Sequence, residues 1–182
     1  MKGVIFNLLE NLTVAKFGDE ILEEIYAEAQ FSVDAPPFVG SETYPDSDLF
    51  AMVTLLSEKT NLPIDDLVYE FGKYMFPVLA NKYPVFLDNI NSPLEFLKSV
   101  NDIIHVEVKK LFEEANPPTI KVKVIDHNQA KLSYKSERKL CKLVEGLLDG
   151  VADYFGQKIS YTHQQCMKDG DPECILHIEF YD

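Results

Sequence analysis

The 182-residue chain lacks the marks of a secreted or membrane-spanning protein. No apolar run approaches the ~18 uninterrupted residues that are typical of a membrane-spanning helix. The opening MKGVIFNLLENLTVAKFGDE has neither the long apolar run nor the small-residue cleavage site of a signal peptide. Cysteines number only three, an odd count that leaves at least one thiol unpaired. These absences predict a cytoplasmic protein with reduced thiols.

Basic residues are outnumbered as well. Lysine and arginine together number 17 against 30 acidic residues, which gives a net charge of −13 and a sequence pI near 4.7. Such a surface repels phosphates and anionic headgroups, so we expect neither nucleic acid nor a membrane as a partner. The apolar fraction of 46% is nevertheless enough for a hydrophobic core, because a chain of this length buries about 70% of its unfolded surface.

The first two thirds of the chain has the periodicity of a helical region. Apolar spacing and breaker residues predict four helices near the start, over residues 3–15, 19–29, 46–59 and 64–76. Ser92-Pro93 then places a capping serine before a proline at the first helical position. The helix that starts there is predicted to reach about Ala115 and to be the longest in the chain, and Asn116-Pro-Pro118 ends it.

Beyond Pro118 the apolar residues change to a period of two. Ile120, Val122 and Val124 alternate with lysines, which predicts a half-buried strand. The remaining expected elements are a returning strand in 132–141, a helix over 137–155, and strands over 158–165 and 173–181. The predicted fold class is therefore α+β, with a helical N-terminal lobe over about 1–60 and a C-terminal lobe with an antiparallel sheet over about 61–182. A single domain over residues 1–182 is expected.

His105, in NDIIHVEVKKLF, is the first candidate ligand. On a helix its face is shared with Asn101, Val108 and Phe112, at the border of the apolar stripe. A lone histidine there is more often a half-buried side chain with a satisfied ring than a ligand. The alternative is a neutral imidazole bound to haem iron, which requires an acceptor for the other ring nitrogen.

Tyr134, Ser136 and Arg138 occupy alternate positions in LSYKSERKLC. A strand would point all three to one side and gather a phenol, a hydroxyl and a guanidinium. The plain interpretation is the solvated face of an edge strand. The functional interpretation is a clamp for a carboxylate or phosphate, because arginine presents a planar fork to such groups. Haem propionates, as paired carboxylates, would suit it.

The three cysteines fall within the last 42 residues and have a histidine among them. Cys141, His163, Cys166 and Cys174 match the Cys₃His set of closed tetrahedral zinc sites. A hairpin would bring His163 and Cys166 close to Cys174. The alternative is that these cysteines are small buried residues of a sheet core. His127 and His177 are given no role.

Taken together, His105, the Y-x-S-x-R motif and the opening M-K-G-x-I-x-N motif resemble the H-NOX family, the haem-nitric oxide/oxygen-binding domains. The resemblance covers essentially the whole chain. It implies a helical distal lobe and a proximal α+β lobe with haem b held between them. It also implies site roles: His105 as axial iron ligand, Tyr134, Ser136 and Arg138 at the propionates, Pro118 packed on the haem, and Ile5 on its distal side.

The resemblance bears on gas selectivity and on zinc. Oxygen-binding members carry a distal tyrosine a few residues past Y-x-S-x-R, whereas residues 139–146 contain none, and Leu143 is the best match for that position. Loss of this hydroxyl donor implies selectivity for NO, with CO as a further ligand. Tyr74 and Tyr154 stay open as alternative donors. The Cys₃His set is similar to the zinc site of some bacterial members, where four protein ligands make the metal structural.

The implied function is a gas sensor. NO at ferrous haem would break the bond to His105, and a chain without a fused output segment would signal in trans to a histidine kinase or a cyclic-di-GMP enzyme. We expect no enzymatic activity, because the distal segments contain no acid–base pair of the kind that a haem peroxidase needs. Two alternatives stay open: a zinc-stabilised protein-interaction domain without haem, and an oxygen-binding haem carrier.

Overall fold

The computed structural model describes residues 1–34, 36–111 and 116–181. Its helices are α1 (Gly3–Phe17), α2 (Asp19–Glu28), α3 (Asp46–Thr60), α4 (Ile64–Lys82), α5 (Pro93–Ser99), α6 (His105–Leu111) and α7 (Cys141–Phe155). Its strands are β1 (Thr119–Val124), β2 (Gln129–Lys135), β3 (Lys158–Gln165) and β4 (Cys174–Tyr181). Three short turns complete it: η1 (Pro84–Leu87), the π-helical η2 (Val100–Ile104) and η3 (Met167–Asp169). The predicted α+β class is confirmed.

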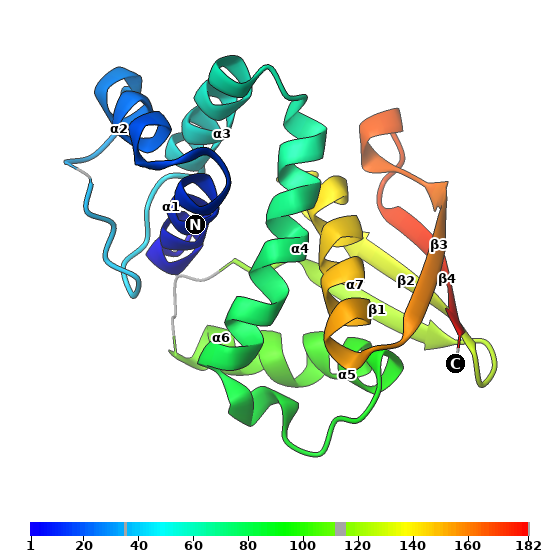
Figure 1. Cartoon of the computed structure of the whole chain (residues 1–182). Coiled ribbons are helices and arrows are strands. Elements are labelled where there is room, and N and C mark those ends of the chain that lie inside the picture. Colours follow the sequence, from blue (N-terminus) through cyan, green and yellow to red (C-terminus); the bar gives the residue numbers. More distant parts are fainter. Residues whose placement is uncertain (35, 112–115, 182) are drawn as a thin grey trace.

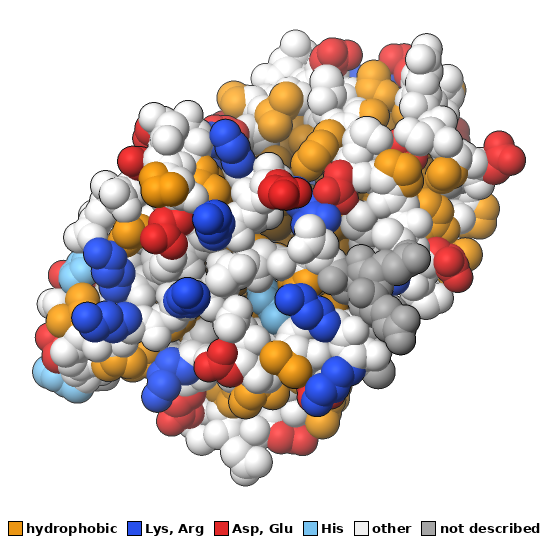
Figure 2. Space-filling model, turned by 180° about the vertical axis from the view of Figure 1, so that it is seen from behind, with side chains coloured by type: hydrophobic (Ala, Val, Ile, Leu, Met, Phe, Trp, Pro, Cys, Tyr) orange, Lys and Arg blue, Asp and Glu red, His pale blue; other side chains and the backbone are white. Residues whose placement is uncertain are grey.

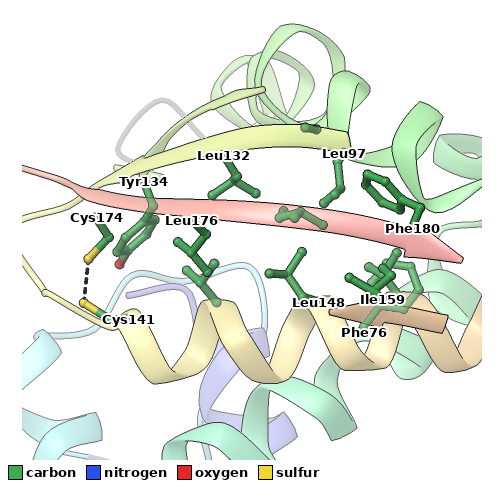
Figure 3. Close-up of a cluster of buried hydrophobic side chains, with 14 of the residues drawn as sticks. Phe76, Leu97, Leu132, Tyr134, Cys141, Leu148, Ile159, Cys174, Leu176 and Phe180 are labelled. Carbon is green, nitrogen blue, oxygen red and sulfur yellow. Dashed lines mark hydrogen bonds between the residues drawn. The ribbon is translucent and has the colours of Figure 1, made fainter. Parts of the chain in front are cut away.

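The four strands form one antiparallel sheet in the order β1-β2-β4-β3, and α7 covers one of its faces (Figure 1). The alternation expected for half-buried strands is clearest in β2 and β4. Their inward residues are buried: Ala130, Leu132, Tyr134, Cys174, Leu176, Ile178 and Phe180. Leu148 of α7 points at this layer (Figure 3), and each such leucine contributes about 1.5–3 kcal/mol of burial.

The N-terminal helices α1 to α3 have a hydrophobic core of their own. It is centred on fully buried side chains from all three helices: Phe6, Leu12, Ile25, Met52 and Leu56. The loop before α3 adds Phe38, whose ring stacks on Phe6 with 4.3 Å between centroids. Figure 1 shows these three helices at one end of the molecule, away from the sheet.

Helix α4 joins the two cores. Leu67, Phe71 and Met75 pack into the core of α1 to α3, whereas Phe76 and Ala80 pack into the core under the sheet. The core of α1 to α3 therefore includes residues beyond 60. Leu147, which is partly buried, contacts both cores from α7. The placing of a lobe boundary at about residue 60 stays a prediction.

Two predicted helices differ from the observed ones. Helix α4 continues past Pro77 to Lys82, because burial of Ala80 and its neighbours outweighs the cost of proline in a helix, about 3 kcal/mol. The helix predicted over 93–115 begins as expected, with Ser92 Oγ accepting the backbone N–H of Glu95 at 3.3 Å. It is then divided into α5, η2 and α6, and its expected end at Ala115 lies outside the described residues. None of the helices that the structure describes is long and apolar enough to cross a membrane.

Asp48, on α3, is a buried carboxylate that fixes the chain between α2 and α3. Its side chain is 1% exposed and accepts hydrogen bonds from the backbone N–H of Ser32, at 3.1 Å, and from the Ser32 hydroxyl, at 2.7 Å. Asp48→Ala is expected to lower the free energy of unfolding by about 2–3 kcal/mol, because these charge-assisted bonds are lost together. Asp48→Asn keeps an acceptor oxygen and should lose less than half as much.

Urea denaturation measures both Asp48 variants. Asp34→Ala is a matched control, since Asp34 is an exposed carboxylate in the same connection. It should change stability by no more than about 0.5 kcal/mol. Equal losses in Asp48→Ala and Asp34→Ala would contradict the role of the buried hydrogen bonds.

Candidate functional site

His105 is the first residue of α6 and directly follows the π-helical turn η2. Its backbone N–H bonds to the carbonyl of Val100, five residues earlier, instead of the usual four. The extra residue rotates the side chains of α6 about the helix axis relative to those of α5. The apolar row along α5 therefore does not continue along α6. Such π turns are frequent at functional sites.

The ring of His105 is half-buried, and its Nδ1 atom is buried without a hydrogen-bond partner among the described residues. Burial lowers the pKa of His105, and the nearby charge of Lys109 lowers it further, against a hydrogen bond to the backbone of Pro118 that raises it. Proline has no N–H, so the Pro118 carbonyl is the acceptor. The lowered pKa favours the neutral imidazole, and Nδ1 has no partner among the described residues. This is the state that a metal ligand needs.

The Y-x-S-x-R residues lie close together, although not on one strand face as expected. Strand β2 ends at Lys135, and the chain turns before α7 begins at Cys141 instead of about Glu137. Tyr134 is 3% exposed, and its hydroxyl accepts the backbone N–H of Leu140 at 3.2 Å. Ser136 Oγ accepts the backbone N–H of Arg138 at 3.3 Å. Turn geometry therefore gathers these groups at the end of β2.

Arg138 is the chain's single arginine, and it binds a carboxylate of α3. Its Nε donates to Asp46 Oδ2 at 2.5 Å and its Nη2 to Asp46 Oδ1 at 3.3 Å, which is the bidentate fork expected of arginine. The third nitrogen, Nη1, donates to the Asn116 carbonyl at 2.7 Å. The N-terminal ammonium of Met1 also lies 2.8 Å from Asp46 Oδ1. Asp46 thus links the start of the chain, α3 and the Y-x-S-x-R turn.

These contacts predict a pH dependence of stability. Burial raises the pKa of Asp46, but hydrogen bonds from Arg138 and the N-terminus outweigh it, so the carboxyl pKa is lowered overall. A carboxyl whose pKa is lower in the folded protein stabilises the fold at pH values above its unfolded-state pKa of about 3.9. This stabilisation is lost as the pH falls through the pKa of the folded protein. The wild-type protein should therefore be more stable than Asp46→Asn at pH 7, and the difference should narrow as pH falls below about 3.9. Urea unfolding from pH 7 to 3 measures this, and a constant difference would contradict it.

Residues expected on the distal side pack against the core of α1 to α3. Ile5 of α1 and Leu143 of α7 are both partly buried there. Tyr74 also packs against this core, and it lines a surface pocket of about 410 Å³ together with Lys16, Glu70 and Tyr154. Tyr154 is 44% exposed, and its ring contacts Phe76. Tyr154 therefore faces this pocket at the surface.

The three cysteines converge at one end of the sheet core. The Sγ atoms of Cys141 and Cys174 are 2.8 Å apart (Figure 3), and Cys166 Sγ lies 3.6 Å from Cys141 and 3.9 Å from Cys174. All three are free thiols, and burial raises the pKa of Cys141 and Cys174. The backbone N–H of Met167 points at Cys174 Sγ at 3.3 Å, which favours a thiolate there. Zinc bound to thiolates at about 2.3 Å separates sulfurs by about 3.8 Å, close to two of these spacings.

His163 does not join this cluster. The group of potential ligand atoms within 4.8 Å of one another holds the three cysteines without it. Its Nε2 instead lies 2.9 Å from Oε1 of Glu145, one turn beyond Cys141 on α7. This arrangement leaves Nδ1 as the ring atom available to a metal, as in carboxylate–histidine–zinc pairs. The predicted fourth ligand is therefore near the cluster in the fold but is oriented by another group.

The fold places the chain in a class of solved domains with the same arrangement of helices and sheet. The chain is similar to the crystal structure of an H-NOX protein from S. oneidensis in the Fe(II)NO ligation state, with 36% identity, all of both chains covered and a TM-score of 0.93. The Fe(II) unliganded H-NOX protein from K. algicida is 29% identical over 100% of this chain and 97% of that one, with a TM-score of 0.89.

A family model described as HNOB, Haem-NO-binding, matches residues 2–163, so the chain belongs to the H-NOX family. The curated soluble guanylate cyclase gcy-37 of Caenorhabditis elegans is 25% identical over 154 residues, and the match spans about a fifth of that protein's length. H-NOX domains bind haem and sense gases, and they are not themselves enzymes.

Three features of the site were not predicted from sequence. The π turn η2 has no signal in the apolar periodicity, because it adds a single residue to an otherwise helical pattern. Asp46 and Glu145 are acidic residues among 30, and only the fold places them beside Arg138 and His163. The single arginine was the available clue, since a lone guanidinium among so many carboxylates is expected to be paired.

Proposed function

We propose that the chain is an NO-selective haem sensor that signals to a partner protein in trans. The observation that carries the proposal is the buried Nδ1 of His105, which has no partner among the described residues and lies directly after a π turn. A buried polar atom without a partner is costly, and binding to iron would satisfy it.

The residues present fit a haem. His105 would hold the iron, and Pro118 lies next to that ring, where the resemblance expects it to pack on the macrocycle. Arg138 already binds the Asp46 carboxylate through two nitrogens, and a haem propionate is a carboxylate that it would bind in the same way. Tyr134 and Ser136 would supply the two hydroxyls. The chemistry that haem supplies is the binding of NO at ferrous iron opposite His105, which weakens the bond to that histidine.

The absence of a matching distal hydroxyl supports selectivity for NO. Leu143, the best match for the distal tyrosine of oxygen-binding members, is an aliphatic residue that packs against the core of α1 to α3. A hydroxyl donor stabilises bound oxygen through its partial negative charge, and a leucine at this position offers none. Binding of NO depends far less on such a donor.

Signalling in trans would use the freedom of the His105 helix. Release of His105 would free α6 and the adjoining η2, and η2 contacts β1 of the sheet. A partner that prefers one arrangement would read the difference, because without differential affinity there is no signal. A histidine kinase or a cyclic-di-GMP enzyme is the class of partner that the resemblance implies.

We also infer that Cys141, Cys166 and Cys174 hold a structural zinc, with His163 as the fourth ligand. The support is the convergence of three free thiols from α7, the end of β3 and the start of β4. Zinc with four protein ligands leaves no open position for water, so its role is to join these elements. A hydrogen bond to Glu145 would fix the ring of His163 for this purpose.

Absorption spectra of the reduced protein test the sensor proposal. The wild type should show a five-coordinate ferrous haem that stays five-coordinate after NO is added. His105→Gly should lose the native iron–histidine spectrum. His127→Gly is the matched control, because His127 is exposed in a turn, and it should keep that spectrum.

The same experiment separates the alternatives. A stable oxygen complex in air would contradict NO selectivity and favour a carrier. A six-coordinate NO complex would contradict release of His105. No Soret band in protein expressed with ample haem would leave a zinc-stabilised interaction domain as the better account.

A further inference from the structure

The outward face of the sheet is rich in lysine, although the chain has a net charge of −13. Helix α7 covers the other face (Figure 1). The outward positions of the strands hold five lysines: Lys121 and Lys123 of β1, Lys131 and Lys135 of β2, and Lys158 of β3. Among the described residues, two carboxylates reach this face: Glu179, at an outward position of β4, and Glu173, directly before β4, which accepts a hydrogen bond from the outward Ser133 hydroxyl. Lysine side chains are visible across this side of the molecule in Figure 2.

The register of the sheet places like charges together. Lys123 lies directly opposite Lys131, and His177 of β4 follows in the same row. Like charges at opposed strand positions destabilise a sheet. Within residues 1–34, 36–111 and 116–181, no ion pair joins Lys121, Lys123, Lys131 or Lys135 to a carboxylate. These four residues, here called the lysine face, are a cluster of positive charge on an acidic protein, and the Glu173 carboxylate meets the cluster at Ser133, opposite Lys121.

The lysine face is tied to the helix that carries His105. The backbone N–H of Ile120, next to Lys121, donates to Oδ1 of Asn101 at 3.4 Å. Asn101 belongs to η2, four residues before His105. A displacement of η2 and α6 would therefore reach β1 directly.

We propose that the lysine face is the docking surface for an acidic helix of a partner protein. The inference rests on the proposed function, because it names the surface that a partner in trans would read. Alternate residues of a strand are about 6.8 Å apart, and every fourth residue of a helix is about 6 Å apart. A helix with a carboxylate at every fourth position therefore matches the spacing of Lys121 and Lys123. Opposite charge across such a contact increases the association rate and fixes the register.

The size of the lysine face favours this occupant over an extended polyanion. From Lys131 to Lys135 the strand advances only about 14 Å. A DNA duplex or an anionic bilayer extends well beyond this length, onto a surface with an excess of carboxylates, and like charges repel. A short acidic helix engages the lysines alone.

The test uses a fluorescein-labelled alanine-based peptide of 20 residues with glutamate at every fourth position. Its binding to the haem-loaded ferrous protein is measured by fluorescence anisotropy in 50 mM NaCl. Lys123→Glu combined with Lys131→Glu is expected to weaken binding at least tenfold. Lys82→Glu combined with Lys168→Glu makes the same charge change on other surfaces and should weaken it less than twofold. Added salt should weaken wild-type binding, as screening requires.

Three results would overturn the proposal. Equal weakening in both double variants would show that net charge alone decides binding. Tighter binding of a 20-base-pair DNA duplex or of phosphatidylglycerol vesicles, with the same dependence on Lys123 and Lys131, would assign the face to a polyanion. Self-association that depends on these lysines would assign it to a second copy of the chain.

The link to His105 is tested in the same samples. NO should change peptide affinity at least threefold in wild type and less than twofold in Asn101→Ala. An unchanged wild-type affinity, with NO bound by absorption spectroscopy, would overturn the link. Failure of the sensor proposal appears separately in that spectrum, because peptide binding to the ligand-free protein does not depend on the NO complex.

Discussion

Gly146→Ala is expected to destabilise the protein by about 3 kcal/mol or more. A Cβ atom on Gly146 would lie 1.9 Å from the carbonyl oxygen of Tyr69 and 2.9 Å from the backbone nitrogen of Lys73. These are backbone atoms of α4, so no side-chain rotation can relieve the contact. Helices α4 and α7 would have to separate, which opens the packing between them, and overpacking of this kind typically costs 1–3 kcal/mol or more.

Urea or thermal denaturation measures this effect, and the chain offers a matched control. A Cβ on Gly40 would meet nothing closer than 3.8 Å, so Gly40→Ala should change stability by no more than about 0.5 kcal/mol. In a chain of this size 1 kcal/mol corresponds to roughly 2–4 °C, so the melting temperature of Gly146→Ala should fall by about 6–12 °C. A fall no larger than that of Gly40→Ala would show that α4 and α7 adjust without loss.

The Gly146 variant also bears on the site. Helix α7 begins at Cys141 and carries Leu143, and Leu143 O is 2.4 Å from the Cβ that Gly72 would bear. The close approach of α4 and α7 thus sets where the cysteine cluster and Leu143 lie. A helix displaced at Gly146 should change the absorption spectrum of the haem-loaded protein as well as its stability.

Much of this fold was predictable because local patterns agree with the final packing. Period-two alternation in β2 and β4 matches a sheet covered on one face, and helical spacing matches α1 to α3. Ser92 before Pro93 marked the start of α5 correctly, since capping is a local interaction. The α+β class therefore followed from the sequence.

The errors have a common physical cause. The helix predicted to end at Phe76 continues through Pro77 to Lys82, because tertiary burial outweighs the cost of the proline. The Y-x-S-x-R residues alternate as a strand would, but β2 ends after Lys135 because the chain must turn into α7. The partners of Arg138 and His163 come from positions 92 residues before and 18 residues before them in sequence, Asp46 and Glu145. Contacts of that kind depend on the fold and leave no local signal.

If the cysteine cluster holds zinc as proposed, Cys174→Ser should remove it and lower the melting temperature by about 10 °C. Cys174 is fully buried and lies within 4 Å of both other thiols, so a hydroxyl there leaves the metal without one of its three sulfur ligands. Loss of a structural zinc lowers the free energy of unfolding by several kcal/mol, and each kcal/mol lowers the melting temperature by roughly 2–4 °C. Metal analysis of the purified proteins and thermal denaturation check both parts. A chelator should lower the wild-type melting temperature to that of the variant and leave the variant unchanged.

Substitutions of His163 and Glu145 test which residue is the fourth zinc ligand. If His163 binds zinc, His163→Ala should weaken zinc affinity well over tenfold, and Glu145→Gln should weaken it less, because loss of an orienting partner typically costs 10- to 100-fold at most. Competition with a chromogenic chelator measures both. Unchanged affinity in His163→Ala would show that the three thiols bind zinc without this histidine, and the pairing of His163 with Glu145 would then be only a surface contact between β3 and α7. The order of the two affinities therefore tests the role of each residue separately.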